Sequence, residues 1–331
     1  MRNTETFSNM INRSLAGLLE QYPEAMLLGE DVEDPFGGSF GVTSGLSTRF
    51  DGRVINTPIS EPSIVGVGSG LALAGFRPIV EIMFGDFIGL CADQIINHAA
   101  KFPWMYGRDI ALPLTIRTAS GSGKNYGPTH SQSLESLFMG LPCFEIWSPF
   151  MLHNVPRIYE MAFLRPIAKL MVEAKALYPV RLPESPHRTS STPDNGETLV
   201  FSNSGGGRPD VVILAYGRMA HVALELMDQL FEEELFVELV VPARIYPFDP
   251  TCLAGRVAEG ARLMVLEEGW ESMGWGRYLS GILYEKWSRR FDRPIKCVGC
   301  ADMAIGTAPE IEALALPTPE KIIAAVRELC R

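Results

Sequence analysis

The spacing of hydrophobic residues changes repeatedly along the chain, between the period of a helix and the continuous apolar run of a buried strand. Residues 10–19 carry apolar side chains at helical spacing, whereas Ala25-Met-Leu-Leu-Gly is a short apolar run. Further strands are expected at 53–57, 78–84, 112–118 and 167–173, and a helix at 92–101. Strands that alternate with helices indicate parallel sheets covered by helices, which is the α/β class.

A further helix is expected to begin at Ser60-Glu61-Pro62. A hydroxyl at the cap, an acid in the first turn and an early proline all suit the free N–H groups of a helix start. The helix is rich in small residues, which predicts close packing against another backbone, such as that of a neighbouring subunit. Its glycines at 66, 68 and 70 lack the spacing of a dinucleotide-binding fingerprint, so we exclude NAD binding.

The range 182–207 interrupts this pattern. It is dense in Pro, Ser, Thr, Asn and Gly, and we interpret it as a linker. Beyond it, strands are expected at 210–216, 237–241, 263–267 and 295–298, and helices at 221–230, 276–287 and 319–329. The sequence therefore predicts two successive α/β domains, 1–181 and 208–331, on either side of the linker.

The composition is that of an ordinary globular protein, with 47% apolar and 21% charged residues. A formal net charge of −10 argues against a nucleic-acid partner, which requires a basic surface. No apolar run approaches the roughly 18 residues of a membrane span, and no leader pattern opens the chain, so no membrane association is expected. Six cysteines among 331 residues indicate reduced, buried thiols and a cytoplasmic protein.

Cys297 and Cys300 form a C-x-x-C motif, which is compatible with a redox or metal site. No second cysteine or histidine pair follows at the spacing of a zinc site. The segment 294–300 has the pattern of a short strand, so we interpret both thiols as structural and expect no metal site in this chain.

Six sequence blocks, taken in order, resemble the beta subunits of pyruvate, branched-chain 2-oxoacid and acetoin dehydrogenases. These proteins are the decarboxylating components of their complexes and belong to the transketolase-like superfamily. The blocks are Gly29–Val32, Gly37–Leu46, Thr57–Gly66, Gly75–Phe87, Asp93–Lys101 and Thr129–Ser133. The resemblance covers nearly all of the first domain and continues more weakly through the second.

This resemblance implies a pyrimidine-binding domain followed by a transketolase C-terminal domain. It also implies thiamine diphosphate shared with an alpha subunit, in an α2β2 heterotetramer. The alpha subunit would hold the diphosphate and its magnesium through a Gly-Asp-Gly motif. The present sequence has Gly85-Asp86-Phe87 but no Gly-Asp-Gly and no P-loop, so the chain alone is expected to be inactive.

Glu61 is the central residue that the resemblance identifies. In the matching motif this glutamate bonds the pyrimidine nitrogen and shares a proton with it, which activates the thiazolium carbon of the cofactor. Such a role requires a poorly solvated carboxyl group with raised proton affinity. The alternative is an acid that is merely favoured at a helix N-terminus, an effect of about 0.3–1 kcal/mol.

Two further side chains would contact the cofactor. The resemblance implies that Phe87 stacks on the aminopyrimidine ring, whereas the alternative is ordinary core packing. Many relatives have glutamine where this chain has Met83, so one polar contact to the cofactor is in question.

His130 follows a polar, glycine-rich loop and belongs to an intact His-Ser-Gln motif. The resemblance implies a role in catalysis or acyl transfer, since an imidazole can exchange protons or stabilise a developing oxyanion. The alternative is a capping or core histidine. Lys124 and Tyr126 in the same loop either reach the substrate or are exposed parts of a surface loop.

Relatives often bind a monovalent cation with an acidic residue in the loop before the strand at Ile167. Residues 162–166 of this chain read Ala-Phe-Leu-Arg-Pro and contain no acid. The sequence therefore argues against that cation site.

Three functions remain open. The first is decarboxylation of a 2-oxoacid with transfer of the acyl group to the lipoyl arm of an acyltransferase partner. The second is a split carboligase of biosynthetic metabolism, in which another carbonyl or a carrier-bound group replaces lipoyl as acceptor. The third is a non-catalytic scaffold that stabilises an alpha-like partner; Glu61, Phe87 and His130 argue against it.

Overall fold

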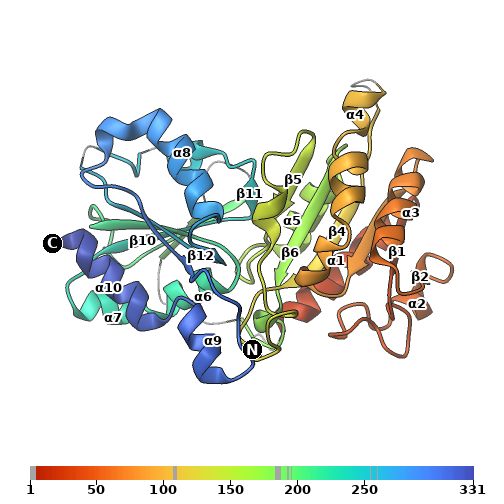
Figure 1. Cartoon of the computed structure of the whole chain (residues 1–331), viewed down its shortest axis with the longest axis horizontal. Helices are drawn as coiled ribbons and strands as arrows, with labels where there is room; N and C mark the ends of the chain where they lie inside the picture. Colours follow the sequence, from red (N-terminus) through yellow and green to blue (C-terminus); the bar gives the residue numbers. More distant parts are fainter. Residues whose placement is uncertain are drawn as a thin grey trace. The chain divides into compact units, whose positions relative to one another are not determined.

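The computed structural model describes residues 5–106, 110–182, 188–191, 194, 196–253, 255–258 and 260–331. The chain forms two compact units (Figure 1). The first unit comprises Met1–Gly121 and Leu137–Leu182, and the second comprises Ser122–Ser136 and Pro183–Arg331. Each is an α/β domain, so the predicted fold class is confirmed.

A parallel sheet forms the centre of the first unit. Its strands, in spatial order, are β5 (Phe144–Trp147), β6 (Ala168–Ala174), β4 (Thr115–Ser120), β3 (Arg77–Ile82), β1 (Ala25–Gly29) and β2 (Val54–Asn56). The strands expected from apolar runs are present. Strand β5 is an addition, because the charged Glu145 in its centre hides the apolar pattern.

Helices of the first unit bury one apolar face each. They are α1 (Phe7–Gln21), α2 (Leu46–Arg49), α3 (Glu61–Leu73), α4 (Phe102–Met105) and α5 (Val155–Phe163). The side chain of Thr6 caps α1 by accepting a hydrogen bond from the Asn9 N–H at 3.3 Å. The helix expected at 92–101 is a π-helix over Gln94–Ala99, followed by α4.

A buried ion cluster lies within this sheet. The guanidinium of Arg117 donates to the carboxylates of Glu81 and Glu173 on the two neighbouring strands, and all three side chains are buried. The hydroxyls of Tyr159 and Tyr178 also donate to Glu173. Burial raises the pKa of Glu81, while the adjacent carboxylates outweigh the effect of burial on Arg117 and raise its pKa well above the usual value.

The second unit contains a mixed sheet. Its spatial order is β13 (Lys296–Cys300), β12 (Leu263–Trp270), β9 (Val211–Ala215), β10 (Val237–Pro242), β8 (Thr198–Ser202) and β7 (Arg188–Ser191). The first four strands are parallel, whereas β8 is antiparallel to β10 and to β7. The short strand β11 (Arg244–Tyr246) follows β10 along the chain.

Helices pack on both faces of this second sheet. They are α6 (Gly217–Glu225), α7 (Met227–Glu232), α8 (Trp275–Trp287), α9 (Pro309–Ala315) and α10 (Pro319–Cys330). Figure 1 shows α8 on one face of the sheet and α10 on the other. The single helix expected at 221–230 is divided between α6 and α7, because Leu226 ends the first and precedes the second.

The range 182–207, which we expected to be a linker, contains strands β7 and β8. Strand β8 is almost entirely buried and pairs with β10 from Ser202↔Glu238 to Thr198↔Pro242. Its polar and glycine-rich surroundings concealed it in the sequence. Residues 183–187, 192–193 and 195 of the expected linker lie outside the described part of the chain.

The segment Ser122–Ser136 belongs to the second unit, although we expected it in the first domain because it follows β4. Its partners explain the difference. The Ser122 hydroxyl donates to Glu268, and the Tyr216 hydroxyl donates to Glu135 at 2.6 Å. Both Glu268 and Tyr216 belong to the C-terminal part of the chain, so contacts distant in sequence decide where this segment packs.

The cysteines are free thiols, and four of the six are buried. Cys297 and Cys300 lie on β13, where a strand was expected, and burial raises the pKa of both. In the described residues, no helix combines the length and apolar character that a bilayer crossing requires.

Candidate active site

Glu61 is the first residue of α3 and lies directly after the loop that follows β2. Its side chain is buried, with 9% relative exposure, whereas an acid that only favours a helix start would ordinarily be solvated. Ser60 occupies the cap position but does not cap with its side chain; its hydroxyl bonds the hydroxyl of Ser63 at 2.8 Å. The carboxyl group of Glu61 thus occupies the poorly solvated position that proton sharing requires.

A second carboxyl group, that of Glu30, lies close to Glu61. Glu30 follows β1, and its Oε1 is buried with no hydrogen-bond partner among the described residues. Burial raises the pKa of Glu30, and the charges of Glu61 and Asp31 raise it further. The sequence analysis quoted Gly29-Glu-Asp-Val without assigning a role to Glu30; the signal was an acid directly after a buried strand.

Phe87 lies in a short 3-10 helix, Gly85–Gly89, just beyond the end of β3. Its ring is half-buried and packs edge-on against Phe84, with centroids 5.6 Å apart. Gly85 is required here because a Cβ would lie 3.1 Å from the Ser120 Cα. Met83, which is also half-buried, lies between the end of β3 and this short helix.

Cys91 connects the aromatic turn to the two acids. Its thiol is fully buried and donates a weak hydrogen bond to the Phe87 carbonyl, with sulfur and oxygen 3.8 Å apart. Burial raises the pKa of Cys91 to about 12, with further contributions from Glu61 and Glu30. The electrostatic influence of Glu61 and Glu30 on Cys91 shows that both carboxyl groups lie near this thiol.

His130, Lys124 and Tyr126 belong to the segment Ser122–Ser136 of the second unit. The Nδ1 of His130 bonds the Thr129 hydroxyl at 2.9 Å, and the ring is half-buried. Lys124 is half-buried, whereas Tyr126 is 46% exposed. A half-buried imidazole suits proton exchange better than a fully buried core role.

A groove of about 490 Å³ lies in the second unit, and one of its lining residues, Gln132, is two positions after His130 in the sequence. Its lining combines apolar and polar side chains: Gln132, Trp270, Ser272, Asp302, Met303 and Ala304. The volume falls within the roughly 300–1,000 Å³ of small-molecule sites. The sequence did not predict this groove, because its lining comes from three separate parts of the chain.

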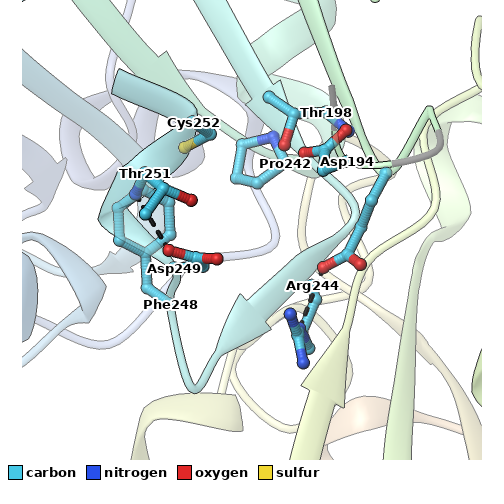
Figure 2. Close-up of a pocket in the computed structure, with 9 residues that line it drawn as sticks. Asp194, Thr198, Pro242, Arg244, Phe248, Asp249, Thr251 and Cys252 are labelled. Carbon is cyan, nitrogen blue, oxygen red and sulfur yellow. Dashed lines mark hydrogen bonds and ion pairs between the residues drawn. The ribbon is translucent and has the colours of Figure 1, made fainter. Parts of the chain in front are cut away.

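A second, more enclosed cavity of the same unit is only about 30 Å³ and is shown in Figure 2. In it the backbone N–H of Thr251 donates to Asp249 at 2.9 Å, and Arg244 pairs with Glu197 at 2.9 Å. This volume is suited to ordered water and is too small for a cofactor or substrate. We therefore assign the cavity no catalytic role.

The ammonium group of Lys169, on β6, bonds the loop that precedes this strand. Lys169 is fully buried, and its Nζ donates to the Arg165 carbonyl at 3.0 Å. Burial lowers the pKa of Lys169 to about 7. Among the described residues, no group of three or more His, Cys, Asp or Glu side chains is arranged to hold a metal ion.

Two family models together match most of the chain. Residues 4–180 match the pyrimidine-binding domain of transketolase, and residues 205–322 match the transketolase C-terminal domain. Solved structures agree on the fold. A split-gene transketolase, described as an inactive beta4 tetramer, superposes with a TM-score of 0.71 over 97% of both chains, at 20% identity.

Several curated proteins are similar along almost the whole chain. The beta subunit of acetoin:2,6-dichlorophenolindophenol oxidoreductase from Bacillus subtilis is 29% identical, covering 99% of this chain and 98% of the relative. The corresponding subunit from Cupriavidus necator is 30% identical, with 96% and 95% covered. The chloroplastic pyruvate dehydrogenase E1 component subunit beta-4 of Oryza sativa subsp. japonica is 28% identical, with 97% and 79% covered.

Proposed function

The chain belongs to the transketolase family, and we propose that it is the beta subunit of a thiamine-diphosphate-dependent enzyme that decarboxylates a 2-oxoacid. The acyl group that remains is transferred to a lipoyl acceptor. The similarity to beta subunits of acetoin and pyruvate dehydrogenases supports this class of reaction. The observation that carries the proposal is the buried carboxyl group of Glu61 close to a second carboxyl group, that of Glu30.

The residues at the carboxyl ends of β1 and β2 fit an aminopyrimidine ring. Glu30 Oε1 and Thr57 Oγ1 are buried polar atoms without a hydrogen-bond partner in the described part of the chain. Buried polar atoms of this kind ordinarily find a partner, and a polar heterocycle would supply one. The half-buried ring of Phe87 offers a flat apolar surface for the same ring.

Glu61 would hold a proton between its carboxyl group and the pyrimidine nitrogen. The cofactor, when bound, supplies a thiazolium carbon that acts as nucleophile towards the 2-oxoacid. Glu30 would assist, because burial and the charges of Glu61 and Asp31 raise the pKa of its carboxyl group, which can then hold a proton near Glu61. None of the ion pairs in the described part of the chain involves Glu30 or Glu61.

His130 would act at a later stage of the reaction. Thr129 bonds the Nδ1 of its ring, and the imidazole would exchange a proton or donate a hydrogen bond to a developing oxyanion. Lys124 and Tyr126 of the same segment would contact the substrate or its entry path. Met83 offers an apolar contact to the cofactor in place of the amide of many relatives.

The alpha partner would supply the remaining half of the site. This chain lacks a Gly-Asp-Gly motif, so we assign the diphosphate and its magnesium to the alpha subunit, in an α2β2 heterotetramer. A lipoyl acyltransferase would be the second macromolecular partner. The alternative, a split carboligase that does not use lipoyl, is favoured by three departures from the dehydrogenase pattern: Met83, the polar loop 120–128 and the lack of an acid in residues 162–166.

The proposal is tested on the chain copurified with its alpha partner. Thiamine diphosphate with magnesium should bind the pair, and pyruvate or another 2-oxoacid should release carbon dioxide with 2,6-dichlorophenolindophenol as electron acceptor. Stimulation by a lipoyl domain supports the dehydrogenase; carbon–carbon bond formation with an added aldehyde and no lipoyl stimulation supports the carboligase. If the complex of this chain with its alpha partner does not bind thiamine diphosphate, both enzyme functions are excluded and the non-catalytic scaffold remains.

A further inference from the structure

The segment Ser122–Ser136 is held at its start by a buried carboxylate. The Ser122 hydroxyl is 1% exposed and donates to Oε1 of Glu268, which lies on β12. The next residue, Gly123, donates its backbone N–H to Glu312 of α9 at 3.0 Å. A hydroxyl bonded to an ionised carboxylate makes a stronger hydrogen bond than a neutral pair.

The middle and the end of the segment are also held by the second unit. Gly127 has a φ of +81°, and a Cβ there would lie 2.6 Å from the Thr307 hydroxyl, so the backbone passes close to Thr307. At the end, the buried Tyr216 donates to Glu135 at 2.6 Å. His130 is thus placed between fixed points whose partners all belong to the second unit.

Glu268 is shared between the segment and the body of this unit. Its Oε1 also accepts a hydrogen bond from Arg218 of α6 at 2.9 Å, and the two side chains are 8% and 25% exposed. Apolar side chains in place of Ser122, Glu268 and Arg218 would avoid the free-energy cost of removing polar groups from water. Hydrogen bonds between polar groups, however, fix one geometry, which is useful where a catalytic side chain must be held accurately.

We propose that Glu268, together with Ser122 and Arg218, is a positioning device for the segment that carries His130. The C-terminal unit then sets where the imidazole lies during turnover, although the segment emerges from a strand of the pyrimidine-binding unit. The proposal rests on the proposed function for its effect on turnover. The anchoring itself is measurable without any cofactor.

The first measurement is amide hydrogen exchange of the full chain, followed by mass spectrometry of peptides covering residues 122–136. Ser122→Ala should accelerate exchange in these peptides about tenfold, because a charge-assisted hydrogen bond is lost. Ser122→Thr keeps the hydroxyl and should restore the slow rate. The matched control is Ser47→Ala, which removes a serine–carboxylate hydrogen bond of 2.8 Å to Asp34 in the other unit.

The second measurement is turnover of the complex with the alpha partner, using pyruvate or acetoin with 2,6-dichlorophenolindophenol. Ser122→Ala and Glu268→Gln should lower kcat about tenfold or more, since small misplacements of a reacting group are costly. The KM for thiamine diphosphate should stay unchanged. A merely structural role would leave kcat per folded molecule intact, whatever the change in melting temperature.

The outcomes separate the two proposals. Unchanged exchange in peptides 122–136 for both Ser122→Ala and Glu268→Gln would overturn the anchoring. Faster exchange with an unchanged kcat in an active complex would overturn the positioning role. A wild-type complex without thiamine-diphosphate-dependent turnover would overturn the proposed function, and the exchange rates alone would then decide whether Glu268 anchors the segment.

Discussion

Two groups of carboxylates in the first unit are built in opposite ways. Glu81 and Glu173 enclose Arg117, and tyrosine hydroxyls donate to Glu173 as well. Glu30 and Glu61 lie near each other without a cation among the described residues, and Glu30 Oε1 has no hydrogen-bond partner there. The first group is complete in itself, whereas the second requires a proton or a ligand.

This difference indicates which group is functional. A fully paired cluster can stabilise a fold, but its members are not available to exchange protons with a substrate or cofactor. An incompletely paired cluster lowers the stability of the unliganded protein and is retained where it does chemistry. The comparison therefore predicts that substitutions in the two groups affect different properties.

The largest expected effect concerns activity. Glu61→Gln should lower turnover by about 10²–10⁴-fold, because the variant cannot share a proton with the pyrimidine ring. The melting temperature should change little, since the side chain lies at a helix start and makes none of the described ion pairs. Steady-state rates and hydrogen–deuterium exchange at the thiazolium carbon, measured by NMR on the complex, would check this. Full turnover in the variant would remove Glu61 from the mechanism.

Arg117→Met should instead act on stability. It leaves Glu81 and Glu173 buried and uncompensated, which costs about 3–5 kcal/mol in the free energy of unfolding. Chemical unfolding of the full chain would measure the loss. The matched control is Arg49→Met, which breaks an exposed ion pair of 2.9 Å with Glu20 and should cost less than about 1 kcal/mol. Equal losses in both variants would mean that the buried cluster is not structural.

Glu267, in the second unit, is intermediate between the fully paired and the incompletely paired carboxylates. It is 3% exposed and makes none of the described ion pairs, but it accepts hydrogen bonds from the N–H groups of Trp275 and Gly276 at 2.8 and 2.7 Å. Burial raises its pKa to about 7, against the opposing effect of these two N–H groups. The backbone N–H groups at the start of α8 thus partly stabilise the charged form of Glu267, as Arg117 stabilises the charged form of Glu81.

The sign of the pH effect follows from this shift. Because the folded pKa lies above the unfolded value of about 4.3, the native state binds more protons between pH 4.3 and 7, and stability falls as pH rises through that range. The loss contributed by Glu267 is up to about 3 kcal/mol. The stability difference between Glu267→Gln and wild type should therefore grow in favour of the variant from pH 5 to pH 8. A pH-independent difference would contradict the shift.

The sequence predicted the strands of the first sheet more completely than it predicted the residues of the site. Local periodicity identified β1, β3, β4 and β6, since a buried strand needs only a short apolar run. Strand β5 was missed because Glu145 interrupts its apolar run; in the fold Arg165 pairs with this charge at 2.8 Å and the Trp147 indole donates to it at 3.0 Å.

The site was predictable only where a local motif marks it. Glu61 could be identified because a helix start and a family motif coincide there. Glu30 was missed because an acid after Gly29 resembles a solvated turn, and only the folded chain brings it near Glu61. The anchoring of Ser122 depends on Glu268, which lies 146 positions away, and no local pattern records such a pair.

The smallest expected effect is that of Glu30→Gln. The folded pKa of Glu30 is raised, so the charged form destabilises the native state above that pKa; a neutral amide should increase stability at pH 8 by less than about 1 kcal/mol. Turnover should fall less than tenfold, because Glu61 can still bind the proton. Thermal unfolding at pH 5 and pH 8, together with steady-state rates, would test both expectations. If Glu30→Gln reduced turnover as much as Glu61→Gln, the two carboxyl groups would have to act as one unit, and Glu61 alone could not be the proton donor to the ring.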